Sequence, residues 1–283
     1  MKIDIGGVKL WFDVEGAKLV PDGPEMKERP TLLLLHGGPG FDHSHLKPAL
    51  SELSDVAQCV FLEHRGNARS DRCSPETWNL AQWGDDVYEF CQALGIEKPI
   101  VIGVSFGGFV AQSYAIRHPE HPAKLILSST SATLRRDRIY DMFERLGGAE
   151  ARQLAETFWS DARNADILGP YIESCLPLYN QTPQGTDWVV RSIMNAELLG
   201  DFFKPGGEGF SFDFRPDLAK VQCPTLVMTG EMDPVTPPPQ SEDIFAALPD
   251  GLAEMHIFKG CGHGVERDDK NAALKTIREF IGA

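Results

Sequence analysis

Residues 98–120, KPIVIGVSFGGFVAQSYAIRHPE, contain the change of pattern that decides the fold. The first seven residues form a short apolar run, which is typical of a strand buried on both faces in a parallel sheet. Apolar residues at helical spacing begin immediately after Ser105. Between the two lies Gly-x-Ser-x-Gly at residues 103–107, a pattern in which a sharp turn exposes the serine hydroxyl. The stretch therefore predicts that Ser105 is a nucleophile on a strand–turn–helix unit.

Outside this stretch, short β-rich runs alternate with helical patterns along the chain. Strands are predicted at residues 31–36, 58–64, 98–104, 124–129, 224–230 and 254–260, after an N-terminal hairpin at residues 1–16. A helix is predicted within residues 77–95, where Gly95 is suited to the C-cap, and another at 274–281. This alternation predicts an α/β fold with a mostly parallel sheet flanked by helices on both faces.

Residues 131–216 interrupt this rhythm. They carry helical patterns without a convincing strand, and they end in a Gly/Pro-rich run at residues 204–217. We interpret them as a helical cap inserted into a core domain formed by residues 1–130 and 217–283. We expect the cap to cover Ser105 and to select substrates, with Trp159 and Phe202 among the residues that do so.

Composition limits the classes of partner. The chain has 283 residues, 42% of them hydrophobic, and a formal net charge of −14. This charge disfavours nucleic acid and anionic membranes, and no apolar run approaches the roughly 20 residues that span a bilayer. The N-terminus has no signal-peptide core, and the six cysteines have no zinc-like spacing. We expect a cytoplasmic protein that uses no metal or cofactor; nothing indicates its oligomeric state.

A serine nucleophile needs a base and an acid, and both have candidates at later strand ends. In this type of fold the expected chain order is serine, acid, histidine. Asp233 follows the strand predicted at 224–230, and His263 lies in a glycine-rich loop after the last strand. Glu231 is a rival acid, although Asp233 lies deeper in the turn, and His256 is a rival base that falls within a strand. The predicted triad is Ser105, Asp233 and His263.

The loop after the first predicted parallel strand is expected to stabilise the negative charge that attack by the serine produces. In residues 31–40, TLLLLHGGPG, a buried strand ends in a histidine and glycines that can expose backbone N–H groups. Attack on a carbonyl produces an oxyanion that needs two such donors. We expect one from Phe106, which follows the nucleophile, and the other from Gly37 or Gly38. His36 is interpreted as a structural residue of the loop.

These motifs carry a family resemblance over essentially the whole chain. HGGPG, the serine turn, EHRGNARS and GEMDPVTP…GCGH together resemble the α/β-hydrolase superfamily, and within it the prolyl aminopeptidase (proline iminopeptidase) branch. The resemblance implies release of an N-terminal proline, or another small apolar residue, from short peptides or amides. Enzymes of this branch hold the free amine with carboxylates, and the match to a Met-Asn-x-Glu segment implies this role for Glu197. Their second carboxylate corresponds to Pro234 here, so it is absent.

Other interpretations remain open. Glu197 is equally compatible with a solvated helix carboxylate. A carboxylesterase needs the same triad but no amine site, and carbon–carbon bond hydrolases and ligand-binding receptors also occur on this fold. Ser105 excludes enzymes that use a carboxylate nucleophile. Arg65 is interpreted as a loop anchor and Cys261 as a packed thiol.

Overall fold

An eight-stranded sheet forms the centre of the molecule. The structure is a computed structural model that describes residues 1–183 and 191–282. In spatial order the strands are β1 (Lys2–Asp4), β2 (Lys9–Glu15), β6 (Gln58–Leu62), β5 (Thr31–Leu35), β7 (Ile100–Val104), β8 (Lys124–Ser128), β9 (Thr225–Gly230) and β10 (Ala253–Phe258). From β6 to β10 all neighbours pair in parallel, whereas β1 and β2 are antiparallel. The predicted mostly parallel sheet is confirmed.

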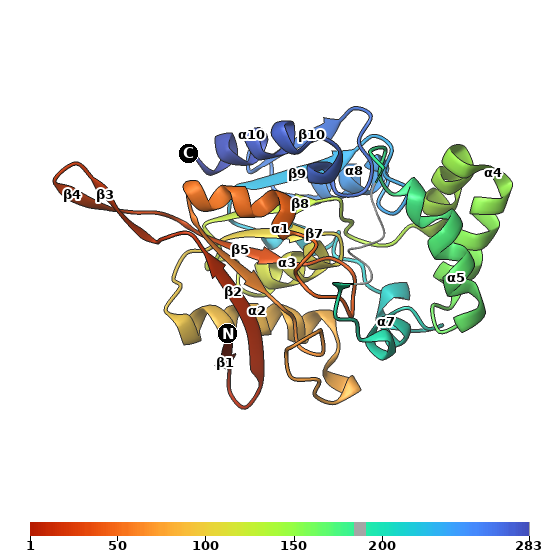
Figure 1. Ribbon diagram of the computed structural model, residues 1–283, viewed down its shortest axis with the longest axis horizontal. Helices are drawn as coiled ribbons and strands as arrows, with labels where there is room; N and C mark the ends of the chain where they lie inside the picture. The colour runs from red at the N-terminus through yellow and green to blue at the C-terminus, as the bar shows by residue number, and fades with distance from the viewer. Residues whose placement is uncertain (184–190, 283) are drawn as a thin grey trace.

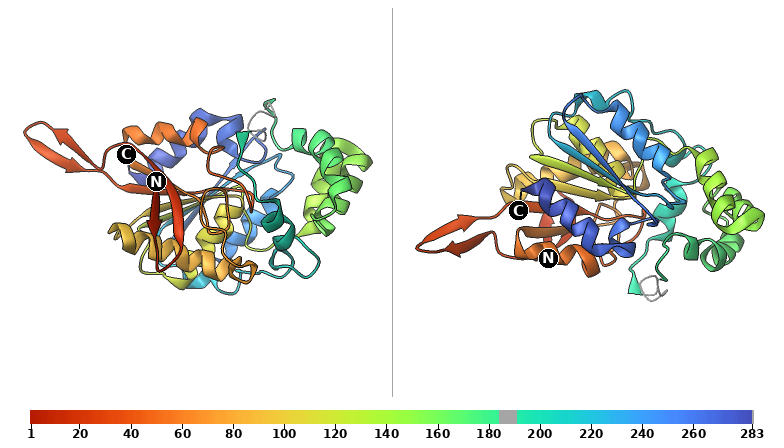
Figure 2. Two further views of the ribbon diagram at one scale, coloured as in Figure 1. Left: turned by 60° about the horizontal axis from the view of Figure 1, so that its bottom comes forward. Right: turned by 90° about the horizontal axis from the view of Figure 1, so that it is seen from above.

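The leucine run of β5 supplies both faces of this sheet with core residues. Leu33 and Leu35 belong to one hydrophobic cluster, and Leu32 and Leu34 belong to the other, because successive strand side chains point to opposite faces. The first cluster is covered by α2 (Leu80–Leu94), α3 (Phe106–Arg117) and α8 (Pro238–Ala247). The second is covered by α1 (Lys47–Leu50), α9 (Val265–Asp268) and α10 (Lys270–Ile281). Figure 2 shows the helices on both faces of the twisted sheet.

The two predicted helices have the expected end signals. The Asn79 side chain accepts a hydrogen bond at the start of α2, and Gly95 ends that helix with a left-handed φ of 66°. Asp269 caps α10 in the same way as Asn79 caps α2. None of the described helices combines the length and the apolar character needed to cross a membrane.

The segment predicted as a cap is helical where the structure describes it. It contains α4 (Arg136–Ser160), α5 (Ala165–Ser174) and α7 (Ala196–Phe202), and α4 is interrupted at Gly148, where φ is 76°. Its described parts, residues 131–183 and 191–216, contain no strand. In Figure 1, α4 and α5 lie side by side at the end of the molecule opposite a hairpin of two strands, β3 (Leu19–Asp22) and β4 (Glu25–Glu28). Its boundaries as a domain stay a prediction, and residues 184–190 lie outside the described residues.

The sequence analysis missed one hairpin. Strands β3 (Leu19–Asp22) and β4 (Glu25–Glu28) pair only with each other and extend away from the sheet (Figure 1). Their residues are mostly exposed, so they lack the apolar alternation that marked the other strands. The two turn residues are Gly23 and Pro24, and glycine at the first turn position is a hairpin signal that could have found it.

The serine turn depends on unusually close backbone packing. A Cβ atom added to Gly107 would lie 2.1 Å from the Leu35 carbonyl oxygen, and one added to Gly103 would lie 2.5 Å from the Gly107 carbonyl oxygen. Both obstacles are backbone atoms, which cannot rotate away as a side chain can. Only glycine therefore allows the first turn of α3 to lie against the ends of β5 and β7.

We expect Gly107→Ala to destabilise the protein by about 1–3 kcal/mol or more, because the added methyl group must displace backbone. Gly169→Ala is the matched control: no atom lies within 4 Å of its Cβ position, and alanine favours a helix by up to about 1 kcal/mol. Urea unfolding of both variants tests this. Equal stability of Gly107→Ala and the wild type would contradict the packing argument.

Candidate active site

Ser105 occupies a strained position between β7 and α3. Its φ of 55° and ψ of −119° are rare for a residue with a side chain. Its backbone is held on both sides, since its N–H donates to the Ser128 carbonyl at 3.0 Å and its own carbonyl accepts from Thr130 Oγ1 at 2.8 Å. The hydroxyl is thereby presented at the N-terminus of α3, at the carboxyl edge of the sheet.

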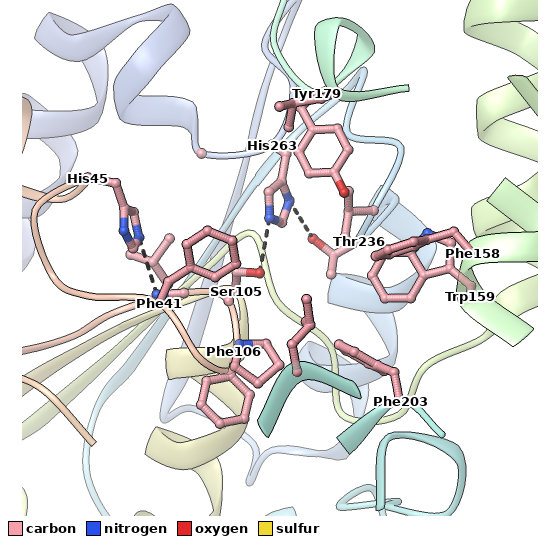
Figure 3. Close-up of a pocket in the computed structure, with 18 of the residues that line it drawn as sticks. Phe41, His45, Ser105, Phe106, Phe158, Trp159, Tyr179, Phe203, Thr236 and His263 are labelled. Carbon is pink, nitrogen blue, oxygen red and sulfur yellow. Dashed lines mark hydrogen bonds between the residues drawn. The ribbon is translucent and has the colours of Figure 1, made fainter. Parts of the chain in front are cut away.

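His263 joins Ser105 to Asp233. Its Nε2 lies 3.0 Å from Ser105 Oγ, and its Nδ1 lies 2.9 and 3.1 Å from the two Asp233 oxygens (Figure 3 shows the serine–histidine contact). An ionised carboxylate only accepts hydrogen bonds, so Nδ1 carries the proton and Nε2 is left to accept from the serine hydroxyl. The structure thus brings together the three side chains of the predicted triad, from the ends of β7, β9 and β10.

Asp233 is held as an anion inside the protein. The side chain is fully buried, which would by itself raise its pKa, but several donors oppose this effect. Its oxygens accept from the Val235 and Thr236 N–H groups and from Thr236 Oγ1, each at 2.8 Å. Together with His263, these contacts keep the pKa of Asp233 below its usual value. The carboxylate can therefore stabilise an imidazolium at His263.

The rival residues lie elsewhere. Glu231 is exposed and accepts from the Gly260 N–H at 3.1 Å, and His256 is exposed on β10. Neither is among the residues that line the cavity beside Ser105.

In the glycine loop, residues 37–40, the N–H group of Gly37 already has an acceptor within the protein. The Gly37 N–H donates to His45 Nε2 at 3.3 Å, and His45 Nδ1 donates to the Asp42 carbonyl at 3.0 Å. Burial and the nearby Arg267 charge hold the pKa of His45 well below its usual value, so the ring stays neutral and Nε2 remains an acceptor. Figure 3 shows His45 beside the serine. Of the two predicted alternatives, this contact favours Gly38 over Gly37 as the donor to an oxyanion.

The second expected donor, Phe106, is the first residue of α3, and the N–H groups of a first helical turn have no acceptor within their own helix. Both Phe106 and Gly38 line the cavity. The oxyanion-hole assignment stays a prediction.

Three other residues discussed in the sequence analysis lie in surroundings that fit a structural role. His36 is buried and contacts the Gly37 carbonyl and the His64 N–H. Arg65 forms a two-point pair with Asp86, at 2.8 and 2.6 Å. Burial raises the pKa of the Cys261 thiol to about 11, so this cysteine is a poor nucleophile.

Within the described residues, no three His, Cys, Asp or Glu side chains are grouped so as to hold a metal ion.

A cavity of about 210 Å³ opens beside the serine hydroxyl. Ser105 and His263 form part of its wall, and most of the rest is aromatic or aliphatic. Rings from separate parts of the chain surround the serine in Figure 3, including Phe41, Phe158, Trp159, Tyr179 and Phe203. Trp159 is where the sequence analysis expected it. Phe202 does not line the cavity; it packs against Trp83 and Phe106, and its neighbour Phe203 takes the place on the wall.

The structure does not bring Glu197 to the cavity. Its side chain is 66% exposed, and its nearest cation is Arg72, with 3.9 Å between Oε2 and Nη1. The residue lies in the first turn of α7, where Leu198 and Phe202 are the side chains turned into the core. An outward carboxylate at a helix N-terminus is favoured by the helix dipole. Glu197 is therefore a solvated carboxylate at this helix end.

The sequence analysis missed the three acidic and basic side chains of the wall other than His263, namely His45, Glu266 and Arg267. The last two follow His263 closely in α9, so their proximity to the predicted base was the only available signal. His45 had none, because its contact with Gly37 does not follow a regular spacing.

The loop that carries His263 is tied to the helical segment. Asp268 accepts hydrogen bonds from the Gly262 N–H at 2.7 Å and from the Gln181 and Thr182 N–H groups at 3.1 and 2.7 Å. The His263 N–H donates to the Tyr179 carbonyl at 2.5 Å. The Asp268 carboxylate thus links the loop that carries His263 to residues 181–182 of the helical segment.

A family model, a curated protein and several solved structures are similar to this chain over most of its length. A family model described as alpha/beta hydrolase fold matches residues 30–265. Proline iminopeptidase PfmaB of Pestalotiopsis fici is 28% identical, over 96% of this chain and 98% of that protein. The solved structure of a proline iminopeptidase from Mycobacterium smegmatis superposes with a TM-score of 0.81 at 22% identity, covering 100% of this chain and 97% of that one. An esterase from Thermogutta terrifontis has a TM-score of 0.71 at 23% identity, covering 99% and 97%.

If Asp233 orients His263, then Asp233→Asn should reduce kcat by about 10⁴-fold, because the neutral amide neither stabilises the imidazolium nor enforces its tautomer. Glu231→Gln is the control, with an expected change of less than a few-fold. Steady-state hydrolysis of a p-nitrophenyl ester measures both. A larger loss in Glu231→Gln than in Asp233→Asn would transfer the acid role to Glu231.

Proposed function

Because the chain belongs to the α/β-hydrolase family, we propose that it is a serine hydrolase that works through an acyl-enzyme on Ser105, and that it acts as an aminopeptidase on short peptides or amides. The observation that carries this proposal is the hydrogen-bonded chain from Ser105 through His263 to Asp233, facing a largely apolar cavity. No cofactor takes part in this chemistry.

The first half of the reaction forms an ester on the enzyme. Ser105 Oγ attacks the substrate carbonyl carbon while His263 Nε2 takes the hydroxyl proton, and Asp233 stabilises the resulting imidazolium. The negative oxygen of the tetrahedral intermediate accepts hydrogen bonds from the Phe106 N–H and the glycine loop. Each such donor typically contributes about 3–4 kcal/mol to the transition state. His263 then gives its proton to the leaving amine nitrogen, and the carbon–nitrogen bond breaks.

The second half releases the product. A water molecule transfers a proton to His263 Nε2 and attacks the acyl carbon, and the intermediate collapses as Ser105 Oγ recovers its proton. The same donors serve both intermediates, so one geometry supports both steps.

The substrate class rests on likeness and on the cavity. PfmaB is named a proline iminopeptidase and matches this chain nearly end to end. A cavity of about 210 Å³ with aromatic walls suits a small apolar acyl group such as a prolyl residue.

Carboxylesterase activity is the second candidate. It is favoured by the exposure of Glu197 and by Pro234 at the position of the second amine-binding carboxylate. An ester with a neutral acyl group needs only the serine, its base and the oxyanion donors. L-Proline p-nitroanilide, its N-acetyl derivative and p-nitrophenyl butyrate separate the two candidates, since equal rates on the free and acetylated anilides favour the esterase.

We expect Ser105→Ala to reduce kcat by about 10⁴–10⁶-fold on every substrate while leaving the melting temperature nearly unchanged, because the nucleophile is lost and the turn tolerates a smaller side chain. Turnover assays and thermal unfolding of the same preparation check both statements. More than 1% residual activity in a preparation free of contaminating hydrolase would disprove the role of Ser105.

We also expect the helical segment to select substrates. Trp159→Ala should enlarge the cavity and raise kcat/KM for bulky acyl groups relative to small ones, since the triad itself is untouched. Glu173→Ala, at an exposed residue of the same segment outside the cavity wall, is the control. A p-nitrophenyl ester series from acetate to octanoate gives the ratios. Unchanged ratios in Trp159→Ala would remove the segment from substrate selection.

A further inference from the structure

The cavity wall contains one carboxylate that the proposed chemistry does not use. Glu266 lies in the first turn of α9, three residues after His263, and its side chain is only 5% exposed. It is the single acidic residue among the described residues that line the cavity. The residue is therefore buried at the wall of the space that receives the substrate.

This carboxylate has no hydrogen-bonding partner among the residues that the structure describes. Across residues 1–183 and 191–282, no N–H or O–H group donates to Glu266, and no Lys, Arg or His nitrogen lies within ion-pair distance of it. Its neighbour Arg267 also lines the cavity and has contacts of its own. Burial lowers the pKa of Arg267, and the negative charge of Glu266 offsets part of that effect. The two charges thus attract each other without forming a direct pair.

A buried carboxylate is strongly disfavoured unless a cation or several donors satisfy it. Among the described residues of the wall, the Arg267 guanidinium is the permanent cation that offers such compensation, but it forms no direct ion pair with Glu266; most other members of the wall are hydrophobic. An occupant with its own positive charge and N–H donors would supply the direct contact to Glu266 that Arg267 does not make.

The position of Glu266 relates it to the reacting atoms. Its Oε1 lies 3.2 Å from the point where a Cβ atom on Gly264 would stand, and Gly264 follows His263 directly and lines the same cavity. The carboxylate therefore belongs to the end of the cavity formed by the histidine loop.

We propose that Glu266 binds the protonated amine of the substrate, taking the role that the family resemblance gave to Glu197. This inference rests on the proposed aminopeptidase function. A prolyl substrate presents a secondary ammonium group with two N–H donors, which match the two oxygens of one carboxylate. A single charge-assisted contact in a mostly apolar cavity then distinguishes free amines from neutral acyl groups.

The test compares L-proline p-nitroanilide with cyclopentanecarboxylic acid p-nitroanilide, which has nearly the same shape and no amine. The wild type should prefer the prolyl substrate in kcat/KM, and Glu266→Gln should reduce this preference roughly 10- to 150-fold, the range for one charge-assisted hydrogen bond. Glu197→Gln is the matched control and should keep the wild-type preference. An unchanged preference in Glu266→Gln, or its loss in Glu197→Gln, would overturn the proposal.

A binding measurement separates this inference from the proposed reaction. Calorimetry in the Ser105→Ala background compares prolinamide with cyclopentanecarboxamide, with and without Glu266→Gln; Glu266→Met replaces the glutamine variant if that variant fails to fold. Preferential binding of prolinamide that disappears with the Glu266 charge supports the inference even if the wild type hydrolyses neither anilide, a result that would refute the proposed function alone. Equal binding of the two amides refutes the inference, whatever the enzyme hydrolyses.

Discussion

The contact between the first turn of α3 and the end of β5 is the constraint on which the rest of the site depends. The position of a Gly107 Cβ, 2.1 Å from the Leu35 carbonyl oxygen, shows that helix and strand meet backbone against backbone. This approach accompanies the strained, positive-φ conformation of Ser105, which points the hydroxyl out of the sheet edge. It also brings the glycine loop after β5 next to the nucleophile, since Gly37 lies close to Ser105 Cβ. A serine and an oxyanion loop from distant parts of the sequence thus become neighbours.

The parallel register of the sheet then delivers the remaining groups. Because β7, β8, β9 and β10 run in the same direction, the loops after β7, β9 and β10 emerge at one edge, which gathers Ser105, Asp233 and His263. The environments of the acid and the base differ. Asp233 is fully buried and surrounded by donors, whereas His263 faces the cavity. This difference keeps the charge fixed on the acid and leaves the base free to exchange a proton with a substrate.

The features predicted from the sequence were those with a local cause. An apolar run followed by a glycine turn predicts a strand end, so the six parallel strands of the eight-stranded sheet and the three side chains at their ends could be located. The β3–β4 hairpin was missed because its strands bury almost nothing. The amine site was assigned to Glu197 by likeness alone, and sequence could not show which way the first turn of α7 faces. The contact of His45 with Gly37 depends on how the glycine loop folds, and no spacing in the chain encodes it. The position of Glu266 on the cavity wall had only its closeness to His263 in the chain as a signal.

The Asp268 carboxylate has a consequence for how the molecule unfolds. It binds the N–H groups of Gln181 and Thr182 together with that of Gly262, and the adjacent Tyr179 carbonyl holds the His263 N–H. Local opening of the helical segment would break these bonds and release the loop that carries the histidine, even with every strand of the sheet intact. Heat inactivation of this protein would then precede melting of its core. Its working temperature would be limited by the stability of the helical segment and not by that of the sheet.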